Sequence, residues 1–441
     1  GENGIFERYI QMLQKIHIQN FKSYKNQDLH LAPLTLMIGA NASGKSNAIE
    51  AFRFLCWLAG GQKLSVLQNA VNDSEKIIRG NVWDLFYPES GSFVLGGTTD
   101  DKAWNTFEVE LDLRNNEELH IKQEKITAVD EKVPLYEIKQ ISKGLGTDVS
   151  VAYNNFAKGM KPQIRCTDQI TIMNQLSGPA PFAAKDKKAQ KEIPKITNRF
   201  QELLSNTLFL DPVPYLMRED SYPNRRLQGN CSNLSGVLYT LWENEKNRPA
   251  ILDFIKSLPE QDIKDIRFSK NGRGEVYLEL VENFGNQERS QSAGLLSDGT
   301  LRVLAIAAAL LSVQEGSTVV IEEVDNGIHP SRARQLLETM QRQAEKRKIR
   351  LLLSTHNPAL MDALPDNALG DVVFCYRDMK EGDSRLIKLS DLSDYPELIL
   401  QGKLGGLVTK GIVDRFVKNP VDKEEKKRKA LAWLENIKGN S

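Results

Sequence analysis

The stretch "LTLMIGANASGKSNAIEAF" (Leu34–Phe52) joins three patterns that decide the fold. Leu34–Ile38 is a near-continuous apolar run, typical of a strand buried on both faces of a parallel sheet. Gly39–Ser46 fits G-x-x-x-x-G-K-S, and the apolar positions after it fall on one stripe of a helix. Such a loop offers backbone N–H groups to phosphate oxygens, and the N-terminus of the helix adds partial positive charge. The stretch therefore predicts a phosphate-binding loop within an α/β fold.

The side chains of this loop have separate expected roles. Lys45 adds a positive charge beside the β- and γ-phosphates, and the Ser46 hydroxyl ligates Mg²⁺. The alternative, a mere Gly-rich turn, leaves the flanking strand and helix unexplained. We expect the nucleotide to be bound by Gly39, Ala40, Asn41, Ala42, Ser43, Gly44, Lys45, Ser46 and Asn47.

A second strand-like run, "STVVIEEVDNGIHP" (Ser317–Pro330), ends its apolar part in two acids. On a sheet beside the phosphate loop, Glu322 would hold the Mg²⁺ shell. Glu323 would then lie next to the γ-phosphate as the base that orients the attacking water. Alone the pattern is weak, because apolar strands often end in acids at the surface. Beside a phosphate loop it becomes a candidate catalytic pair.

Two further segments carry candidate site residues. "LLLSTHNP" (Leu351–Pro358) places His356 at the end of another buried strand, where a γ-phosphate sensor would lie. A lone His is more often structural. In "GLLSDGTLRVLAIAAAL" (Gly294–Leu310), Ser297 caps a long apolar helix and Gly299 lets the backbone approach a ligand. By itself, this segment is better explained as a capped core helix.

Composition sets limits on the class of protein. The chain has 441 residues, 40% of them hydrophobic and 26% charged, and a formal net charge of zero. The length suggests two or three subdomains, and the neutral balance argues against coating of nucleic acid by bulk charge. The four Cys lie far apart without a C-x-x-C pair, so we expect a reducing, cytoplasmic location. The longest apolar run, Leu301–Val313, is too short to span a bilayer, so no membrane is expected as a partner.

The rest of the chain alternates between strand and helix patterns. Leu13–Leu31 predicts a strand pair, Phe93–Ile141 an antiparallel sheet, and Asp186–Asn198 an exposed connection or helix face. Further predictions are a helix over Cys231–Glu245, capped by Ser232 or Asn233, and a strand over Glu275–Asn283. We expect the following parts: 12–92, the N-terminal ATPase lobe with the phosphate loop; 93–206, antiparallel β and insertion; 207–290, a helical and strand insertion; 291–410, the C-terminal part of the head; and 411–441, a charged helix or tail.

The order of these motifs resembles the ABC-type ATPase heads of the RecF/SMC class. L-S-D-G-T (Leu296–Thr300) stands where that superfamily has L-S-G-G-Q. "IHIQNFKSYKNQDLHLAPLTLMIGANASGKSNAIEAF", "NCSNLSGVLYTL", "EEVDNGIHP", "STHNP" and "GKLGGLVTKG" resemble compact RecF-like ATPases of bacteria. Those are related to OLD-family nucleases and to ATPase subunits of anti-phage systems such as Septu, PARIS and some retrons. The resemblance extends from about Leu13 to Phe416, but no motif matches between Phe93 and about Asn206.

This resemblance implies an α/β fold: an ABC-type ATPase head with a mostly parallel central sheet flanked by helices, an antiparallel β subdomain and a helical insertion. It also implies ATP and Mg²⁺ as cofactors and a homodimer, or higher homo-oligomer, that sandwiches ATP. One subunit would give Gly39–Asn47, Glu322, Glu323 and His356, and the other would give Ser297 and Gly299. ATP binding would close the dimer and hydrolysis would release it.

The chain departs from the family pattern in two places. The acid that holds Mg²⁺ is usually Asp, whereas here it is Glu322, whose extra methylene displaces the carboxylate. Because Mg²⁺ tolerates little change in geometry, slow turnover is expected. The Gln that usually completes the Mg²⁺ shell has no evident equivalent, and Gln175 is only a weak candidate.

Three functions remain open. The first is a defence ATPase that senses infection, through DNA or a phage-derived trigger, and controls a separately encoded nuclease or toxin. The second is a RecF-like DNA-repair ATPase, and the third is an ATP-stabilised scaffold with little hydrolysis. A DNA clamp needs a basic surface, so the neutral charge favours the first and third. Basic runs such as Glu345–Arg350 keep the second open, and the chain after His356 shows no acidic nuclease cluster.

Overall fold

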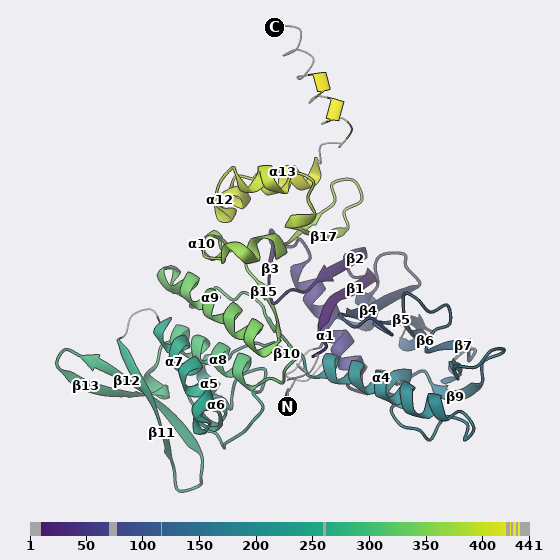
Figure 1. The fold of residues 1–441 in the computed structure, drawn as a ribbon, viewed down its shortest axis with the longest axis horizontal. Coiled ribbons are helices and arrows are strands. Elements are labelled where there is room, and N and C mark those ends of the chain that lie inside the picture. The colour runs from purple at the N-terminus through teal and green to yellow at the C-terminus, as the bar shows by residue number, and fades with distance from the viewer. Residues whose placement is uncertain are drawn as a thin grey trace, which may run out of the picture.

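The fold is known from a computed structural model, which describes residues 10–69, 77–115, 117–258, 262–419, 424, 427, 428, 431 and 432. Its described residues form a 14-stranded mixed sheet, a separate three-stranded antiparallel sheet, and helices on both faces of the large sheet (Figure 1). The α/β fold predicted from the sequence is confirmed. None of the described helices combines the length and apolar character that a membrane span requires.

Five parallel strands form one half of the large sheet, in the order β10–β14–β15–β3–β16. The strand before the phosphate loop, β3, is buried at every position and pairs on both sides, as its apolar sequence predicts. Because the strands are parallel, their carboxyl ends and the loops that follow meet at one edge of the sheet. The bounds of the five strands are Leu208–Leu210 (β10), Thr318–Ile321 (β14), Arg350–Ser354 (β15), Leu34–Ile38 (β3) and Val373–Arg377 (β16).

The same sheet continues beyond β16 in the order β17–β2–β1–β4–β5–β6–β7–β8–β9. Neighbouring strands there are antiparallel, except that β17 and β2 are parallel. Sequence patterns predicted the β1–β2 pair and the strands β4 to β7, and the structure confirms them. The bounds are Leu13–Phe21 (β1), Tyr24–His30 (β2), Ser92–Thr99 (β4), Thr106–Arg114 (β5), Glu118–Thr127 (β6), Tyr136–Ile141 (β7), Asp148–Tyr153 (β8), Gln163–Thr167 (β9) and Ser384–Lys388 (β17).

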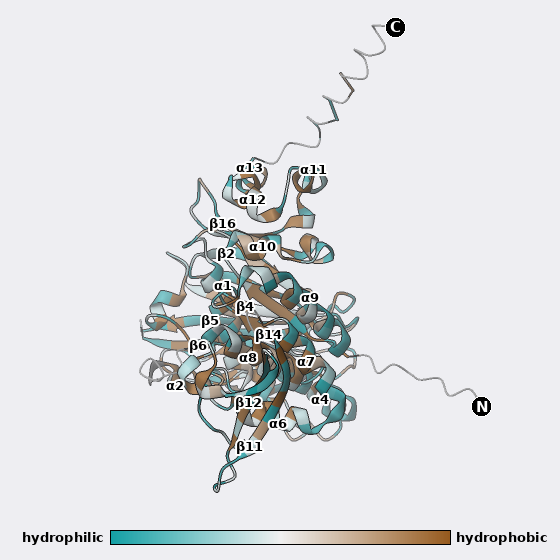
Figure 2. Cartoon of the chain, turned by 90° about the vertical axis from the view of Figure 1, so that its left-hand side faces the viewer, coloured by the Kyte–Doolittle hydropathy of each residue, from teal (hydrophilic) through white to brown (hydrophobic). Residues whose placement is uncertain are grey.

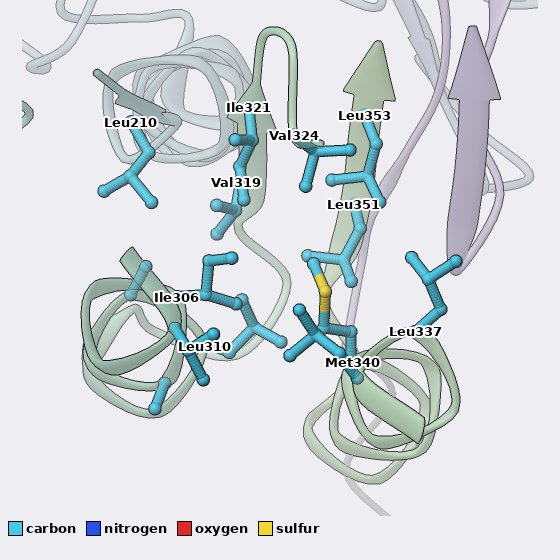
Figure 3. Packing of buried hydrophobic residues seen from close by; sticks show 14 of the residues in the cluster. Leu210, Ile306, Leu310, Val319, Ile321, Val324, Leu337, Met340, Leu351 and Leu353 are labelled. Carbon is cyan, nitrogen blue, oxygen red and sulfur yellow. The ribbon is translucent and has the colours of Figure 1, made fainter. Parts of the chain in front are cut away.

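Two hydrophobic cores lie on opposite faces of the large sheet. Leu36 of β3 belongs to one core and its neighbour Met37 to the other, because successive side chains of a strand point to opposite faces. The first core packs α8 (Asp298–Ser312) and α9 (Pro330–Arg347) under β14 and β15, with Ile306, Leu310 and Met340 against the strands (Figure 3). The second contains α1 (Lys45–Ala59) and α4 (Lys187–Ser205), which contact each other.

The remaining elements extend these two cores. The separate sheet consists of β11 (Ile263–Lys270), β12 (Val276–Phe284) and β13 (Gln287–Ser292). The other helices are α2 (Leu64–Asn69), α3 (Ile172–Gln175), α5 (Pro214–Met217), α6 (Leu234–Glu243), α7 (Arg248–Lys256), α10 (Pro358–Asp362), α11 (Tyr395–Ile399), α12 (Leu404–Thr409) and α13 (Ile412–Lys418). Figure 1 shows α10, α12 and α13 together at one end of the molecule.

Some local predictions need correction or addition. The Lys-rich segment after Asp186 is a helix with a buried stripe that includes Ile193 and Phe200, so the helix-face alternative is right. Asn233 occupies the cap position of α6, but its side chain does not cap; it accepts from the Gln228 N–H and donates to the Arg226 carbonyl. The sequence did not predict β8 or β9. The proposed domain boundaries stay a prediction, and most of the 411–441 segment lies outside the described residues.

Candidate nucleotide-binding site

The loops at the carboxyl edge of β3, β14, β15 and β16 enclose a cleft of about 310 Å³. Sequence motifs separated by some 300 positions thus meet at one place, as the parallel arrangement predicts. The lining residues are Asn41, Ala42, Gly44, Lys45, Ser46, Asn47, Arg79, Glu322, Glu323, Ser354, Thr355, His356 and Arg377.

The two glycines of the phosphate loop are required by its backbone. Gly39 and Gly44 have φ of 152° and 119°, in the region that favours glycine. A Cβ at Gly39 would lie 2.3 Å from the Cys375 carbonyl oxygen, and one at Gly44 would lie 2.3 Å from the Ser384 Oγ. The loop therefore rests closely on β16 and β17, and side chains at these positions would push it out of place.

Lys45 lies inside the loop. Its ammonium donates to the carbonyl oxygens of Gly39, at 2.5 Å, and Ala40, at 3.0 Å. Burial lowers the pKa of Lys45, while Cys375 and Glu323 act to raise it. A partly desolvated cation held by carbonyl groups can transfer to phosphate oxygens at little cost, because the anion replaces weaker neutral acceptors.

Ser46 and Glu322, the pair predicted to hold Mg²⁺, contact each other in the structure. The Ser46 hydroxyl donates to the Glu322 carboxylate at 3.2 Å, although the two residues are 276 positions apart. Burial raises the pKa of Glu322, and the nearby Arg53 and Ser46 act to lower it. Two oxygen ligands at this separation fit one side of a Mg²⁺ shell.

Glu323 has a strained backbone, with φ of 47°, at the turn after β14. Its N–H donates to the Ser354 Oγ at 3.0 Å, and its carboxylate accepts from the Asn326 amide at 3.2 Å. The adjacent Asp325 accepts from the Thr355 hydroxyl at 2.5 Å. These bonds tie the turn after β14 to the end of β15, so they fix where the Glu323 side chain points.

His356 is exposed and lines the cleft two positions after β15 ends. The preceding residue, Thr355, is buried, and its N–H donates to the Met37 carbonyl at 3.1 Å. His356 is therefore held at the rim by a backbone bond between β15 and β3. Its position at the rim agrees with the predicted role near the outer phosphate.

Two arginines of the cleft were missed by sequence reasoning. Arg79 donates to the Asn47 side chain at 2.8 Å and pairs with Glu50 at 2.9 Å. Arg377, at the end of β16, donates to the Ala42 carbonyl at 3.1 Å. Neither belongs to a motif, and only their positions in the fold bring these cations to a phosphate site.

Ser297 and Gly299, which were also predicted to contact the nucleotide, lie outside the cleft of their own chain. Ser297 is exposed and caps α8, as predicted, by accepting from the Thr300 N–H at 3.2 Å. A Cβ at Gly299 would lie 2.1 Å from the Gly327 carbonyl oxygen, so this glycine allows close packing against the turn after β14. Neither residue is among those that line the cleft of the same chain. Gln175, the weak candidate for the Mg²⁺ shell, instead bonds to the backbone of Thr167 and Ile170.

Two protein-family models match the chain. The model described as "AAA domain, putative AbiEii toxin, Type IV TA system" matches residues 154–362, which include Ser297, the acid pair and His356. The model described as "AAA domain" matches residues 15–210, which include the phosphate loop. Together with the Helicobacter pylori relative described next, these matches show that the chain is an ATPase, as the sequence predicted.

Individual proteins are similar over most of the chain. A Helicobacter pylori protein named "ATP/GTP phosphatase" is 23% identical over 359 residues, which cover 80% of this chain and 87% of that protein. An SMC head bound to the C-winged helix domain of ScpA is 14% identical, with a TM-score of 0.45, covering 85% of this chain and 97% of that one. The SMC head domain from Thermotoga maritima is 14% identical, with a TM-score of 0.38, covering 86% and 98%.

Proposed function

We propose that the chain binds ATP with Mg²⁺, closes as a homodimer around ATP, hydrolyses it slowly, and thereby controls a separately encoded effector in anti-phage defence. One observation carries the ATP chemistry: Lys45, Ser46, Glu322, Glu323 and His356 line a single cleft. The Helicobacter pylori relative, named for ATP and GTP, supports the same substrate class.

The residues of the cleft fit a nucleotide with Mg²⁺. Among the described residues no group of three or more His, Cys, Asp or Glu side chains could hold a metal ion. Ser46 and Glu322, which contact each other in the cleft, would hold Mg²⁺ together with phosphate oxygens and water, the usual arrangement for this ion. Mg²⁺ supplies neutralisation of charge on the β- and γ-phosphates when bound.

The remaining steps belong to the side chains of the chain itself. Lys45 binds the outer phosphate oxygens, and Arg79 and Arg377 add positive charge at two further sides of the cleft. Glu323 orients a water molecule and accepts its proton as the water attacks. The Glu322 carboxylate, one methylene longer than an Asp, holds the ion less rigidly, which is the basis for slow turnover.

The position of Ser297 supports a shared site. Ser297 and Gly299 lie at the N-terminus of a 15-residue helix, where unpaired N–H groups favour an anion, yet neither residue lines the cleft of its own chain. A second copy would bring them to the phosphate. Light scattering tests this: Glu323→Gln should dimerise with ATP, because ATP stays uncleaved, whereas Glu323→Gln combined with Ser297→Arg should stay monomeric. ATP-induced dimers of the double variant would refute the shared site.

The proposal of a separately encoded effector draws on one of the family matches. One matched family model is described in terms of a toxin and a type IV toxin–antitoxin system. We expect the purified chain alone to cut neither DNA nor RNA, and a nuclease or toxin gene to lie beside its own. Metal-dependent cleavage by the chain alone, lost on changing carboxylates after Gly370, would overturn the separate effector.

One of the basic runs that favoured the DNA-repair alternative is partly used inside the fold. Arg347, within Glu345–Arg350, donates to the Leu310 and Val313 carbonyls at the end of α8, so its charge is used inside the fold. Arg350 is only partly exposed, and burial lowers its pKa. A run with two inward-facing cations offers less charge to a phosphate backbone than its sequence suggests.

A further inference from the structure

A buried glutamate on α1 holds two cations beside the nucleotide cleft. Glu50 is 6% exposed, although a carboxylate is costly to bury unless it is paired. It forms ion pairs with Lys22, at 2.6 Å, and with Arg79, at 2.9 Å. Glu50 is not among the residues that line the cleft, whereas Arg79 is. The acid would therefore act on a bound nucleotide through Arg79.

Three elements bring these residues together. Helix α1 packs against β1 and β4 (Figure 2). Lys22 follows β1 directly, and Glu50 lies one turn along α1 from Ser46, on the same face of the helix. Arg79 precedes the short helix η2 (Val82–Leu85). The turn after β1, the first turns of α1 and the segment before η2 therefore meet beside the cleft.

The backbone of Arg79 is bound by the same two side chains. Its N–H donates to the Glu50 carboxylate at 2.6 Å, and its carbonyl accepts from the Lys22 ammonium at 3.0 Å. The chain after Arg79 is attached to the same turn, because the Lys22 N–H donates to the Leu85 carbonyl at 2.8 Å. Lys22 has φ of 47°, a conformation that is uncommon outside glycine and recurs at functional sites. These contacts fix the backbone of Arg79 on both sides.

The side chain of Arg79 is directed by two hydrogen bonds. Its Nε donates to Glu50 at 2.9 Å, and its Nη2 donates to the Asn47 side-chain oxygen at 2.8 Å. Asn47 is itself held, because its amide nitrogen donates to the Ser23 hydroxyl at 2.9 Å. A guanidinium has five N–H groups in a rigid fork, so Arg79 can keep these bonds and also bind a phosphate oxygen. The Arg79 side chain is 58% exposed and lines the cleft, so a ligand can reach it.

We propose that Glu50 and Lys22 are positioning residues for Arg79, and that they hold its guanidinium where a phosphate of the bound nucleotide lies. A free arginine side chain has many rotamers, and a phosphate that binds it must offset the entropy lost on ordering. Arg79 is ordered in advance by its partners, so more of the strong contact between arginine and phosphate appears as affinity. The inference rests on the proposed function, because it takes the cleft to bind ATP.

Calorimetric titration of the full chain with ATP and Mg²⁺ tests the role of Arg79. Arg79→Ala should lower ATP affinity by about tenfold or more, because a charge-assisted contact to phosphate is lost. Arg273→Ala, at an exposed arginine outside the cleft, is the matched control and should bind ATP as the wild type does. Unchanged affinity in Arg79→Ala would overturn the inference alone if Lys45→Ala still lowered the affinity. Unchanged affinity in both variants would overturn the ATP site itself.

A double-mutant cycle tests whether Glu50 acts through Arg79. Glu50→Gln should lower ATP affinity by about threefold or more in the wild type and should not change it in Arg79→Ala, where no guanidinium remains to be positioned. A Glu50 that only stabilises the fold would lower the affinity by the same factor in both backgrounds, which would overturn the inference. Full affinity in Glu50→Gln would also overturn it. Glu124→Gln, at a buried glutamate outside the cleft, is the control and should keep ATP affinity.

Lys22→Met provides a second variant, because removing one partner of a buried ion pair can unfold a protein. It keeps both bonds from Arg79 to Glu50 and removes only the bond to the Arg79 carbonyl and the ion pair of Lys22. Lys22→Met should lower ATP affinity in the wild type and leave that of Arg79→Ala unchanged. Melting curves show which variants fold, and if Glu50→Gln does not, the cycle with Lys22→Met decides. Equal losses in the two backgrounds, or no loss in a folded Lys22→Met, would overturn the inference.

Discussion

At the scale of the residue, the phosphate loop is held by side chains from β2 and β17 that belong to no motif. The Tyr24 hydroxyl donates to the Gly44 carbonyl at 2.8 Å, and the Ser384 hydroxyl donates to the Ser43 carbonyl at 2.6 Å. Both side chains are fully buried. These bonds hold the carbonyl groups of Ser43 and Gly44 on the side of the loop that faces β2 and β17.

Lys45→Ala should lower ATP affinity by a hundredfold or more, because charge-assisted bonds to phosphate contribute about 1.5–3 kcal/mol each. Titration calorimetry measures this change. Lys403→Ala, at an exposed lysine outside the cleft, is the control and should bind ATP normally. Unchanged ATP affinity in Lys45→Ala would show that the site is misassigned.

Glu322 should make Mg²⁺-dependent ATP binding sensitive to acid. Its raised pKa means that a proton competes with Mg²⁺ at a higher pH than for an ordinary glutamate. Affinity for ATP with Mg²⁺ should therefore fall between pH 8 and pH 5.5 in the wild type and in Glu323→Gln. Glu322→Gln should bind ATP weakly and with a smaller pH dependence, since only the terminal phosphate of ATP then titrates in this range. A pH dependence as steep as that of the wild type would contradict the assignment.

At the scale of the element, the sequence pattern predicted those helices and strands whose burial is visible as a run of apolar residues. The buried strands β3, β14 and β15 and the helix α8 follow from their apolar runs. Patterning did not predict β9, which is half exposed. For the α4 segment, which contains Pro194, it left an exposed connection and a helix face as alternatives. The motif residues of the cleft were predictable because loop chemistry fixes their types. Arg79 and Arg377 were not, since any exposed arginine looks alike in sequence.

Gly299→Ala should destabilise the protein by about 1–3 kcal/mol. Its Cβ would meet the Gly327 carbonyl, a backbone atom that cannot rotate away. Gly406→Ala is the matched control, because Gly406 also lies in a helix but has nothing within 4 Å. Gly406→Ala should stabilise the protein by up to ~1 kcal/mol, because alanine has a higher helix propensity than glycine. Thermal unfolding compares the two, and equal melting temperatures would contradict the packing argument.

Glu124 should give the antiparallel half a pH-dependent stability. Burial raises its pKa to about 7, although its carboxylate accepts from Tyr136 and from the N–H groups of Ile172 and Met173. A raised pKa means that its stabilisation is complete below about pH 4.5 and is lost as the pH rises through 7. Glu124→Gln should be less stable than the wild type at pH 5. Its stability should fall less than that of the wild type between pH 5 and pH 8. Melting curves at both pH values test this, and an unaltered pH dependence would refute it.

At the scale of the whole molecule, the two cores lie on opposite faces of one sheet, and the nucleotide cleft opens at its edge. Helix α8 belongs to one core and α1 to the other, so the elements that carry Ser297 and the phosphate loop lie on different faces. That separation is the reason to expect two copies to complete each site.

Mixing two inactive variants tests that expectation. Ser297→Arg and Lys45→Ala should each abolish ATP hydrolysis, because each lesion reaches both sites of a homodimer. Their heterodimer has one site with both lesions and one site with neither, so ATPase activity should partly return on mixing. If the subunits exchange and no activity returns, independently competent shared sites are ruled out. Normal turnover by Ser297→Arg alone would rule out the sandwich.

The large sheet is continuous, but its neighbouring strands are joined by different numbers of residue pairs. Strand β17, which is antiparallel to β16, is joined to β2 by a single parallel residue pair, Ser384 with Tyr24. The Gln27 side chain accepts from the Leu386 N–H, where a neighbouring strand would usually supply a carbonyl. Tyr24 and Ser384, the residues that join β17 to β2, also hold carbonyl groups of the phosphate loop. A nucleotide bound at that loop would therefore act directly on the junction between these two strands.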